Sequence, residues 1–341
     1  MGRTGLRVGV GGFARSCLAA LLIAAAPGSS QTVTPSSKPA YQYIRAGNPL
    51  DLKTQPQPGA ALMGGGKDLD PAFRWLCERA HGGDFLILRA RGDDEYNPYI
   101  NKLCKVNSVA TLILPSRESA EDPFVAETIR NAEAIFIAGG DQSNYIKFWQ
   151  GTPVQAAINE RLRDGVPIGG TSAGLAVLGE FVFTAMNDTA YSKETLADPY
   201  NKGVTLGSDF LHVPYMTGIL TDQHFVKRDR LGRSVGFMAR ILQDGTASSV
   251  REIAVDERNA VLVDENGNAT LIGKGAAYFF KPTQKPEVCQ PGKPLTFRNI
   301  DVYKITGKAT FQLKDWVGSG GTSYVLSAVD GQLQSSVGSV Y

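Results

Sequence analysis

Between residues 58 and 170 the chain alternates short apolar runs with amphipathic stretches, and this alternation constrains the fold more than any other feature. The apolar runs have the length of strands, and the stretches between them have helical spacing. We expect strands at 60–64, 84–90, 108–115, 134–140 and 166–170, and helices at 70–80, 122–132 and 153–165. Such alternation predicts an α/β fold in which helices sandwich a parallel sheet.

Three of the predicted strands end in glycine, at Gly64–Gly66, Gly139–Gly140 and Gly169–Gly170. The carboxyl ends of parallel strands meet at one edge of a sheet, where ligands bind. Glycine allows close approach of neighbouring backbones because it has no Cβ atom. The three glycine-rich ends therefore predict one shared crevice.

After about residue 245 the pattern changes to β-hairpins, with turn signals at Asn266-Gly267 and Lys274-Gly275. We expect a catalytic α/β domain over residues 58–285. A β-rich C-terminal extension is expected over residues 286–341.

The N-terminal segment has the pattern of an export signal. Three arginines precede the apolar run 17–26, which is followed by small and polar residues. We expect a signal peptide at 1–30 and then a linker or N-terminal arm at 31–57, which is rich in proline, serine and threonine. The mature protein would be periplasmic or secreted. It would not contact a membrane after signal cleavage, because no later run reaches the length of a spanning helix.

Composition and cysteine usage exclude several classes of protein. The formal net charge is +2 and the basic residues are scattered, so the sequence offers no footprint for nucleic acid. The mature chain keeps three cysteines, Cys77, Cys104 and Cys289, and one pair of them could form a disulfide. Their spacing matches no metal-binding motif, and we expect no metal or organic cofactor.

The segment Gly-Thr-Ser-Ala-Gly at 170–174 contains a candidate nucleophile, Ser172. It follows a predicted strand and opens a helix-prone stretch, which is the setting of a nucleophile elbow. The backbone N–H of Ala173 would then point to the place where an oxyanion forms. The alternative interpretation is an ordinary hydroxyl in a glycine-rich loop.

A serine nucleophile needs a base, and the chain has three histidines. His224 follows an apolar strand, where a crevice is expected, and is the preferred candidate. His81 follows a predicted helix, and the simpler interpretation is an exposed side chain at the end of that helix. His212 is read as a packed or solvent-edge side chain.

Three carboxylates are candidates to orient the histidine: Asp222, Asp256 and Glu257. Glu257 ends a short predicted strand and would reach the crevice from a neighbouring strand, although it also fits a solvated turn. The order Ser172, His224, Glu257 differs from that of the α/β-hydrolases, in which the histidine comes last.

Three motifs together resemble the cyanophycinases and their relatives in the S51 serine peptidase family. The motifs are "AGGDQ" at 138–142, "GGTSAGL" at 169–175 and "DQHFVKRDRLGR" at 222–233. The resemblance extends from about residue 58 to 280. It implies a flavodoxin-like fold of the kind found in class I glutamine amidotransferases.

The resemblance also implies a role for each matching residue. Ser172 would be the nucleophile, His224 the base and Glu257 the acid of the triad. The backbone amides of Gly140 and Ala173 would form the oxyanion hole. The residues implied in substrate binding are Gln142, Asp222, Gln223, Arg228, Arg230 and Arg233.

The implied substrate is cyanophycin, a poly-aspartate with an arginine on each side-chain carboxyl, which is cut to β-Asp-Arg dipeptides. Each repeat offers a free carboxylate, and an arginine fork binds carboxylates in a bidentate way. The basic cluster at 227–233 would serve this purpose; otherwise it is the solvated face of a helix. The polar segment 181–207 would form a lid or one wall of the pocket.

Two other functions remain open at this stage. One is a dipeptidase of the same family that acts on aspartyl or isoaspartyl peptides. The other is a secreted binding protein that keeps the fold without catalysis. In each case the partner is a peptide or polymer, and the resemblance suggests a homodimer.

Overall fold

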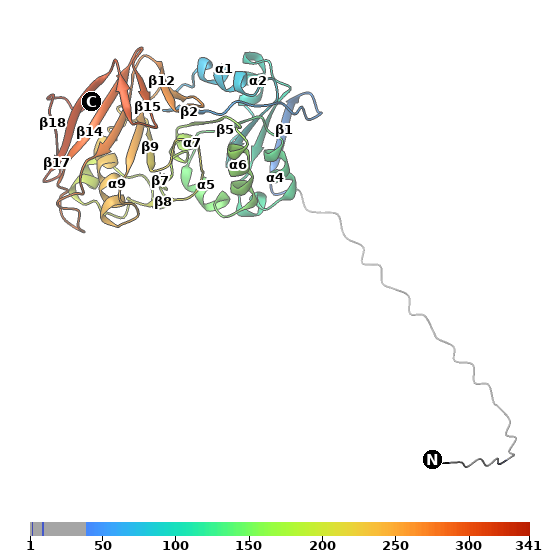
Figure 1. Cartoon of the computed structure of the whole chain (residues 1–341), viewed down its shortest axis with the longest axis horizontal. Helices are drawn as coiled ribbons and strands as arrows, with labels where there is room; N and C mark the ends of the chain where they lie inside the picture. The colour runs from blue at the N-terminus through green and yellow to red at the C-terminus, as the bar shows by residue number, and fades with distance from the viewer. Residues whose placement is uncertain (1, 3–8, 10–38) are drawn as a thin grey trace. The chain divides into compact units, whose positions relative to one another are not determined.

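The computed structural model describes residues 39–341, together with Gly2 and Gly9 (Figure 1). The predicted signal peptide and the first part of the expected arm lie outside these described residues. Residues 39–341 form one compact α/β unit that contains two mixed sheets.

The first sheet has ten strands, of which the second to the sixth in spatial order run parallel to one another. These five are β4, β3, β5, β6 and β2, and they correspond to the five strands expected between residues 60 and 170. The other strands pair antiparallel. In spatial order the strands are β1 (Gln42–Gly47), β4 (Ser108–Ile113), β3 (Asp84–Arg89), β5 (Ala134–Ile137), β6 (Ile168–Thr171), β2 (Ala60–Met63), β11 (Asn259–Val263), β12 (Asn268–Gly273), β15 (Thr310–Gln312) and β16 (Val317–Ser319).

The second sheet has eight strands and was not anticipated as a separate layer. Strands β7, β9 and β10 run parallel, and the remaining neighbours pair antiparallel. In spatial order the strands are β18 (Gln332–Ser335), β17 (Thr322–Val329), β14 (Phe297–Thr306), β13 (Ala276–Pro282), β10 (Arg251–Val255), β9 (Ile219–Gln223), β7 (Phe181–Phe183) and β8 (Leu206–Ser208).

The helices cover both faces of the parallel region and lie beside the second sheet (Figure 1). They are α1 (Asp70–Arg79), α2 (Tyr96–Leu103), α3 (Arg117–Ala120), α4 (Pro123–Arg130), α5 (Gln142–Trp149), α6 (Pro153–Arg163), α7 (Ala173–Ala176), α8 (Ser192–Ala197) and α9 (Leu231–Gln243). Helix α4 begins within one residue of the start expected from the sequence. The Asp122 side chain accepts a hydrogen bond from the backbone N–H of Phe124 at 2.9 Å, and Pro123 is the first helical residue.

The two faces of the parallel region pack against different helices. On one face, Phe73 and Leu76 of α1 and Ile100 of α2 belong to one apolar cluster. On the other face, the buried residues of α4, α5 and α6 join a larger cluster that continues to the second sheet. Full burial of one such side chain stabilises the fold by about 1.5–3 kcal/mol, so these clusters hold the strand ends of the site in place.

The segment 31–57, expected as a linker or arm, contributes strand β1, which pairs antiparallel with β4 along the full length of both strands. Its alternation of polar and apolar residues is weak, since Gln42 and Gly47 are exposed and the residues between them are only half-buried. An edge strand of this kind takes most of its stability from backbone pairing, which explains why composition pointed to a linker.

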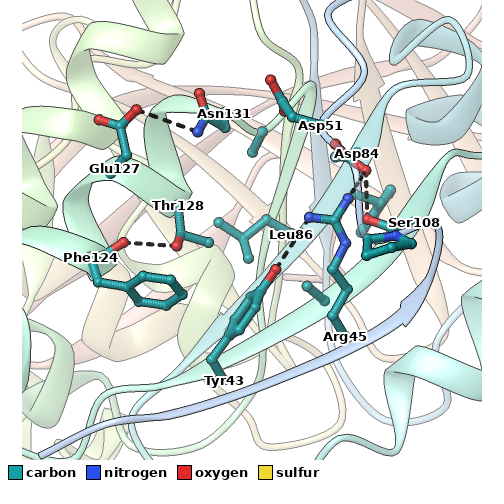
Figure 2. Close-up of a pocket in the computed structure, with 14 residues that line it drawn as sticks. Tyr43, Arg45, Asp51, Asp84, Leu86, Ser108, Phe124, Glu127, Thr128 and Asn131 are labelled. Carbon is teal, nitrogen blue, oxygen red and sulfur yellow. Dashed lines mark hydrogen bonds and ion pairs between the residues drawn. The ribbon is translucent and has the colours of Figure 1, made fainter. Parts of the chain in front are cut away.

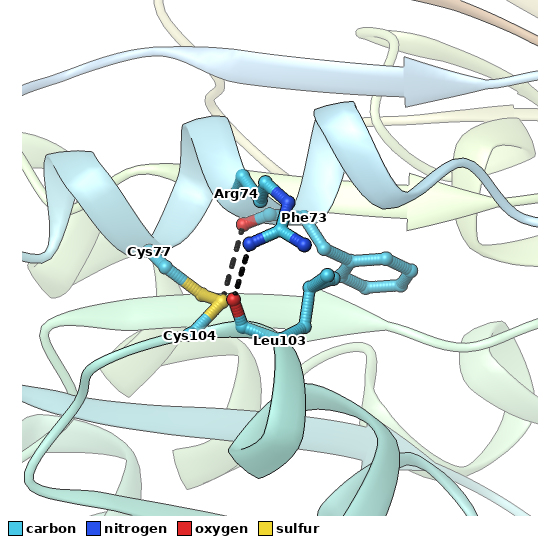
Figure 3. Close-up of a disulfide and its surroundings, with 5 residues drawn as sticks. All are labelled: Phe73, Arg74, Cys77, Leu103 and Cys104. Carbon is cyan, nitrogen blue, oxygen red and sulfur yellow. Dashed lines mark hydrogen bonds between the residues drawn. A yellow bond between two sulfur atoms is a disulfide. The ribbon is translucent and has the colours of Figure 1, made fainter.

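Two of the cysteines form a disulfide. Cys77 on α1 is bonded to Cys104, which directly follows α2, so the bond ties these two helices together (Figure 3). Arg74 strengthens the same junction by donating to the backbone oxygen of Leu103 at 2.7 Å. Cys289 is buried and has no disulfide partner within residues 39–341. In this part of the chain, no helix has the length and apolar character needed to cross a membrane.

Candidate active site

Ser172 stands on a strained turn between β6 and α7. Its backbone has φ 52° and ψ −116°, a conformation that L-residues rarely adopt. The turn is tight, because a Cβ atom on Gly174 would lie 2.0 Å from the backbone oxygen of Ile137. The backbone N–H of Ser172 donates to Met63 at 3.1 Å, which ties the turn to the end of β2. This is the strand–turn–helix geometry that the sequence predicts.

His224 follows β9 of the second sheet, yet it is fixed by the glycine loop of the first sheet. Its backbone N–H donates to the oxygen of Gly64 at 2.8 Å. Its ring lies against Gly65, on which a Cβ atom would be 2.4 Å from Cε1. Gly65 also has φ +89°, so two independent constraints require glycine here. The glycine-rich end of β2 therefore positions the histidine.

Ser172, His224 and Glu257 form a continuous hydrogen-bonded series. The Ser172 Oγ lies 2.7 Å from Nε2 of His224, and Nδ1 of the same ring lies 2.6 Å from Oε1 of Glu257. Strands β9 and β10 are parallel, with Gln223 opposite Val255. His224 and Glu257 therefore leave the sheet at the same edge, one and two residues beyond that pair.

The other candidates from the sequence do not contact this series. His81 is exposed after α1, and His212 is exposed and paired with Asp209 at 2.8 Å. Asp256 accepts from the backbone N–H of Lys227 at 3.0 Å. Of the three candidate acids, only Glu257 reaches the imidazole of His224.

The environment of the pair keeps His224 neutral and Glu257 ionised near neutral pH. Burial lowers the pKa of His224, and the charges of Arg228 and Arg230 lower it further against the opposing hydrogen bond to Glu257. Burial alone would raise the pKa of Glu257. The hydrogen bond from His224 and the charge of Arg228, whose Nε lies 3.8 Å away, outweigh burial and hold that pKa below its ordinary range.

The two expected oxyanion-hole residues flank Ser172. Ala173 opens α7, so its N–H is one of the helix N-terminal donors that are not used within a helix. Gly140 follows β5 with φ +151°. A Cβ atom on its neighbour Gly139 would lie 3.5 Å from Cβ of Ser172. The hydroxyl of Tyr145 fixes this loop by donating to the backbone oxygen of Ala138 at 2.8 Å.

The predicted substrate-binding residues divide into a buried network and an exposed arginine. Asp222 is buried and accepts hydrogen bonds from Nε and Nη2 of Arg233, the first at 2.8 Å. Arg230 is also buried, and its Nη1 donates to the backbone oxygen of Gln223 at 2.9 Å and lies 3.5 Å from Asp222. The side chain of Arg228, in contrast, is 53% exposed. The basic cluster at 227–233 is therefore not simply the solvated face of a helix, because Arg230 and Arg233 are buried.

The network carries a net positive charge because one ionised carboxylate faces two guanidinium groups. Burial raises the pKa of the neighbouring Glu252 well above its ordinary value, so that carboxyl stays neutral. Burial alone would raise the pKa of Asp222, but the charges of Arg233 and Arg230 reverse the shift, so Asp222 stays ionised. Burial lowers the pKa of Arg230 to about 10, which leaves it protonated at neutral pH. An unbalanced buried cation next to an open pocket favours an anionic ligand.

A pocket of about 340 Å³ lies over this network, next to the loop that carries Gly140. Its lining is mostly polar and joins residues of both sheets. Gln142, Arg228, Arg230 and Arg233 are the predicted binding residues in it, while Asp222 and Gln223 support it from below. Gln142 is held by its own donation to the backbone oxygen of Phe183 at 3.3 Å.

Part of the segment 181–207 lines this pocket. The lining residues from this segment are Phe183, Ala185, Met186, Asp188 and Thr189. Sequence reasoning placed a wall or lid here without naming residues. It also missed Asp141 and Lys147 of the lining. Asp141 has a recognisable sequence signal, because it caps α5 through the N–H of Ser143 at 2.9 Å.

One acidic cluster lies elsewhere, at the opposite ends of the parallel strands. The carboxylates of Asp51, Asp84 and Glu133 have oxygen atoms within 4.8 Å of one another. Asp84, however, is already paired with Arg45 at 3.0 Å and accepts from Ser108 at 2.5 Å (Figure 2). Burial raises the pKa of Glu133 to about 7, so this carboxyl titrates near neutral pH. Glu133 also accepts from the backbone N–H of Asp84 at 2.8 Å, so Asp84 and Glu133 both have partners within the protein.

Comparison with known proteins places the chain in a family. The model of peptidase family S51 matches residues 89–267, which is more than half of the chain. A cyanophycinase from Trichormus variabilis is 26% identical over 210 residues, covering 60% of this chain and 65% of the relative. A cyanophycinase from Synechococcus elongatus is 25% identical over 215 residues, covering 61% and 62%. The chain thus spans less than two thirds of the length of these relatives.

Among solved structures, a peptidase from an acI-B1 Actinobacterium matches with a TM-score of 0.49 and 18% identity, covering 76% of this chain and 98% of that chain. The match to the family model includes the strand that precedes Ser172, the turn itself, and both His224 and Glu257. The chain belongs to peptidase family S51.

Proposed function

We propose that this chain is an exported serine exopeptidase of the cyanophycinase type, with Ser172, His224 and Glu257 as its catalytic triad. The observation that carries the proposal is the continuous hydrogen-bonded series, with 2.7 Å from Ser172 to His224 and 2.6 Å from His224 to Glu257. Both distances are within hydrogen-bonding range. The first allows proton transfer from the nucleophile to the base, and the second allows the acid to orient the base.

In the proposed reaction, the Oγ of Ser172 attacks the carbonyl carbon of the scissile peptide bond while Nε2 of His224 takes its proton. Glu257 accepts a hydrogen bond from Nδ1 and so keeps Nε2 free as the base. The imidazolium then gives the proton to the leaving amine. Water, activated by the same histidine, hydrolyses the acyl-enzyme and restores Ser172.

The oxyanion of each tetrahedral intermediate would bind the backbone amides of Ala173 and Gly140. In enzymes of this type one such donor contributes about 3–4 kcal/mol to transition-state stabilisation. The strained backbone of Ser172 supports this assignment, because the turn exposes the hydroxyl and aims the next N–H at the same place.

The pocket next to the triad supports a substrate that carries both charges. Arg228 and Arg230 provide guanidinium groups for a carboxylate, and Asp141 and Asp188 provide carboxylates for a cation. Each repeat of cyanophycin presents one free carboxylate and one guanidinium. Relatives that are named cyanophycinases support the same choice of substrate.

Two further parts of the proposal concern the fold and the location. We propose a flavodoxin-like core of the class I glutamine amidotransferase kind, supported by the five parallel strands and the helices on both of their faces. Export is supported by the signal-like N-terminal sequence and by the Cys77–Cys104 disulfide, since such bonds form in oxidising compartments.

The test is incubation of the purified protein with cyanophycin, followed by mass spectrometry of the released peptides. We expect β-Asp-Arg dipeptides from the wild type and none from Ser172→Ala. Release of dipeptides with gradual shortening of the polymer, and without internal fragments of several repeats, would establish exopeptidase action. Hydrolysis of aspartyl or isoaspartyl dipeptides alone would instead favour the dipeptidase, and inactivity on all of these substrates would contradict the proposal.

A further inference from the structure

Tyr341 lies against the loop 224–231, which begins with the candidate base and carries the arginines. Its hydroxyl donates to Oδ1 of Asp229 at 2.8 Å and accepts from the backbone N–H of Leu231 at 3.1 Å. Burial raises the pKa of Tyr341 above its ordinary value, so the hydroxyl stays protonated and can donate this hydrogen bond. The phenol therefore bridges two points of the loop that are separated by one residue.

The ring of Tyr341 makes a second contact with the same loop. It packs edge-on against Phe225, with 5.7 Å between the ring centroids, and Phe225 directly follows His224. Phe225 is fully buried. On its other side Tyr341 approaches Tyr278 of β13 at 6.2 Å, and the oxygen of the preceding Val340 accepts from Tyr324 at 3.1 Å. The C-terminal strands thus anchor the tyrosine.

Backbone hydrogen bonds connect residues within the loop 224–231, so displacing one residue also displaces the residues bonded to it. The N–H of Arg228 donates to the oxygen of His224 at 2.9 Å, and the N–H of Arg230 donates to Phe225 at 2.9 Å. Asp229 stands between the two arginines with φ +48°, a costly conformation for a residue other than glycine. The contact from Tyr341 to Asp229 helps to hold this conformation.

The hydroxyl of Tyr341 also accepts a hydrogen bond from the first backbone N–H of α9. Leu231 is the first residue of this helix, and its N–H belongs to the donors that need a partner from outside the helix. Arg230, at the preceding position, directs its guanidinium to the backbone oxygen of Gln223 instead. A residue more than a hundred positions away in the chain therefore takes the role of the cap.

We propose that Tyr341 is a positioning residue of the candidate active site, holding the loop 224–231 so that Arg228 and Arg230 face the substrate pocket and the base. The part of this inference that concerns substrate rests on the proposed function. Its effect on His224 does not, because that effect is a property of the protein alone.

The charged groups around His224 determine what a displaced loop would do. Glu257 faces it from the turn after β10, and Arg228 and Arg230 face it from its own loop. The first sheet contributes the uncharged Gly65 and the hydroxyl of Ser172. Moving the arginines away or opening the loop to water would make protonation easier, so the pKa of His224 would rise.

The test is Tyr341→Phe, which keeps the ring and removes only the hydroxyl. The matched control is Tyr303→Phe, because the hydroxyl of Tyr303 also accepts a backbone N–H, from Gly321 at 2.8 Å, but lies away from the loop. The pKa of His224 is measured by NMR in the full chain, where only three histidines contribute and His224→Gln assigns the signal.

We expect the pKa of His224 to rise in Tyr341→Phe and to stay unchanged in Tyr303→Phe. With cyanophycin, KM should rise by about five- to tenfold in Tyr341→Phe while kcat changes by less than about twofold, because the displaced arginines bind substrate. If Tyr341→Phe changes neither this pKa nor KM, Tyr341 has a merely structural role and the inference is wrong. If the wild type does not cleave cyanophycin, the proposed function fails, and the titration of His224 still decides the inference.

Discussion

The imidazole of His224 lies directly on Gly65, so closely that a Cβ atom on the glycine would be 2.4 Å from Cε1. These residues follow strands of different sheets, β9 and β2. Their contact brings the proposed base, from the second sheet, to the proposed nucleophile, from the first. The active-site geometry therefore depends on the junction between the sheets as much as on either sheet alone.

This contact predicts the effect of Gly65→Ala. The added methyl group must displace the imidazole, and a displacement of about 1 Å at a catalytic group typically costs about a hundredfold in rate. We expect kcat to fall by at least about a hundredfold, measured on cyanophycin. Gly82→Ala is the control, because Gly82 has a similar φ of +81° and open space for a Cβ atom among the described residues.

Both glycine variants should lose about 1 kcal/mol of stability from the left-handed backbone conformation. Only Gly65→Ala should lose activity. Equal activities of the two variants would show that the contact between Gly65 and His224 does not position the base.

The second prediction concerns pH. His224 must be neutral to act as a base, and its pKa lies below the ordinary value near 6.5. The value of kcat/KM should therefore be constant above about pH 6.5 and fall at lower pH as His224 becomes protonated. Stability should fall over the same interval, because the unfolded chain takes up the proton more readily than the folded one.

Arg228→Gln tests the electrostatic origin of this shift. Removing a cation makes protonation of His224 easier, so the acidic limb of kcat/KM should move to higher pH. Lys281→Gln removes one charge from the exposed end of β13 and should leave the limb in place. A limb that is unmoved in Arg228→Gln would contradict the assigned cause.

The third prediction concerns the buried network. Asp222→Asn keeps the shape of the side chain but leaves Arg233 and Arg230 without a buried counter-charge. Breaking a buried ion pair in this way costs about 3–5 kcal/mol. Urea unfolding should show that loss. The control is Asp164→Asn, which breaks the exposed pair with Arg161 and should cost less than about 1 kcal/mol. Equal losses of stability in the two variants would show that the buried pairs are worth no more than an exposed one.

The fourth prediction concerns the disulfide. Cys77 and Cys104 are 27 residues apart, so their bond restricts the unfolded chain by about 3 kcal/mol. The double variant Cys77→Ala/Cys104→Ala should lose about that much in denaturant unfolding. Cys289→Ala removes a buried thiol without a disulfide and should lose about 1 kcal/mol. A double variant as stable as the wild type would show that the bond is dispensable.

The parts of the fold and site that the sequence predicts depend on local pattern. The five strands from 60 to 170 are recognisable because each is a short apolar run, and four of the five end in glycine or proline. The turn at Ser172 is recognisable because strand, serine and helix are contiguous in the chain. His224 is recognisable as a candidate because it directly follows an apolar strand.

The parts that the sequence does not predict depend on pairing between distant segments. Strand β1 pairs with β4 some sixty residues later, whereas composition alone suggests only a linker or an N-terminal arm. Lys147 and Asp188 reach the pocket only because α5 and the segment after β7 meet there. The contact of Tyr341 with Asp229 crosses more than a hundred residues, and a lone tyrosine carries no local signal of such a contact.

The central claim, that Ser172 is a nucleophile activated by His224, is tested most directly by a fluorophosphonate probe, which reacts with activated serines. The account predicts one adduct on the wild-type chain, located at Ser172 by peptide mass spectrometry. It predicts no adduct on Ser172→Ala and labelling at least about a hundredfold slower on His224→Gln. An unmodified Ser172 in the wild type, or equally fast labelling of His224→Gln, would contradict the claim.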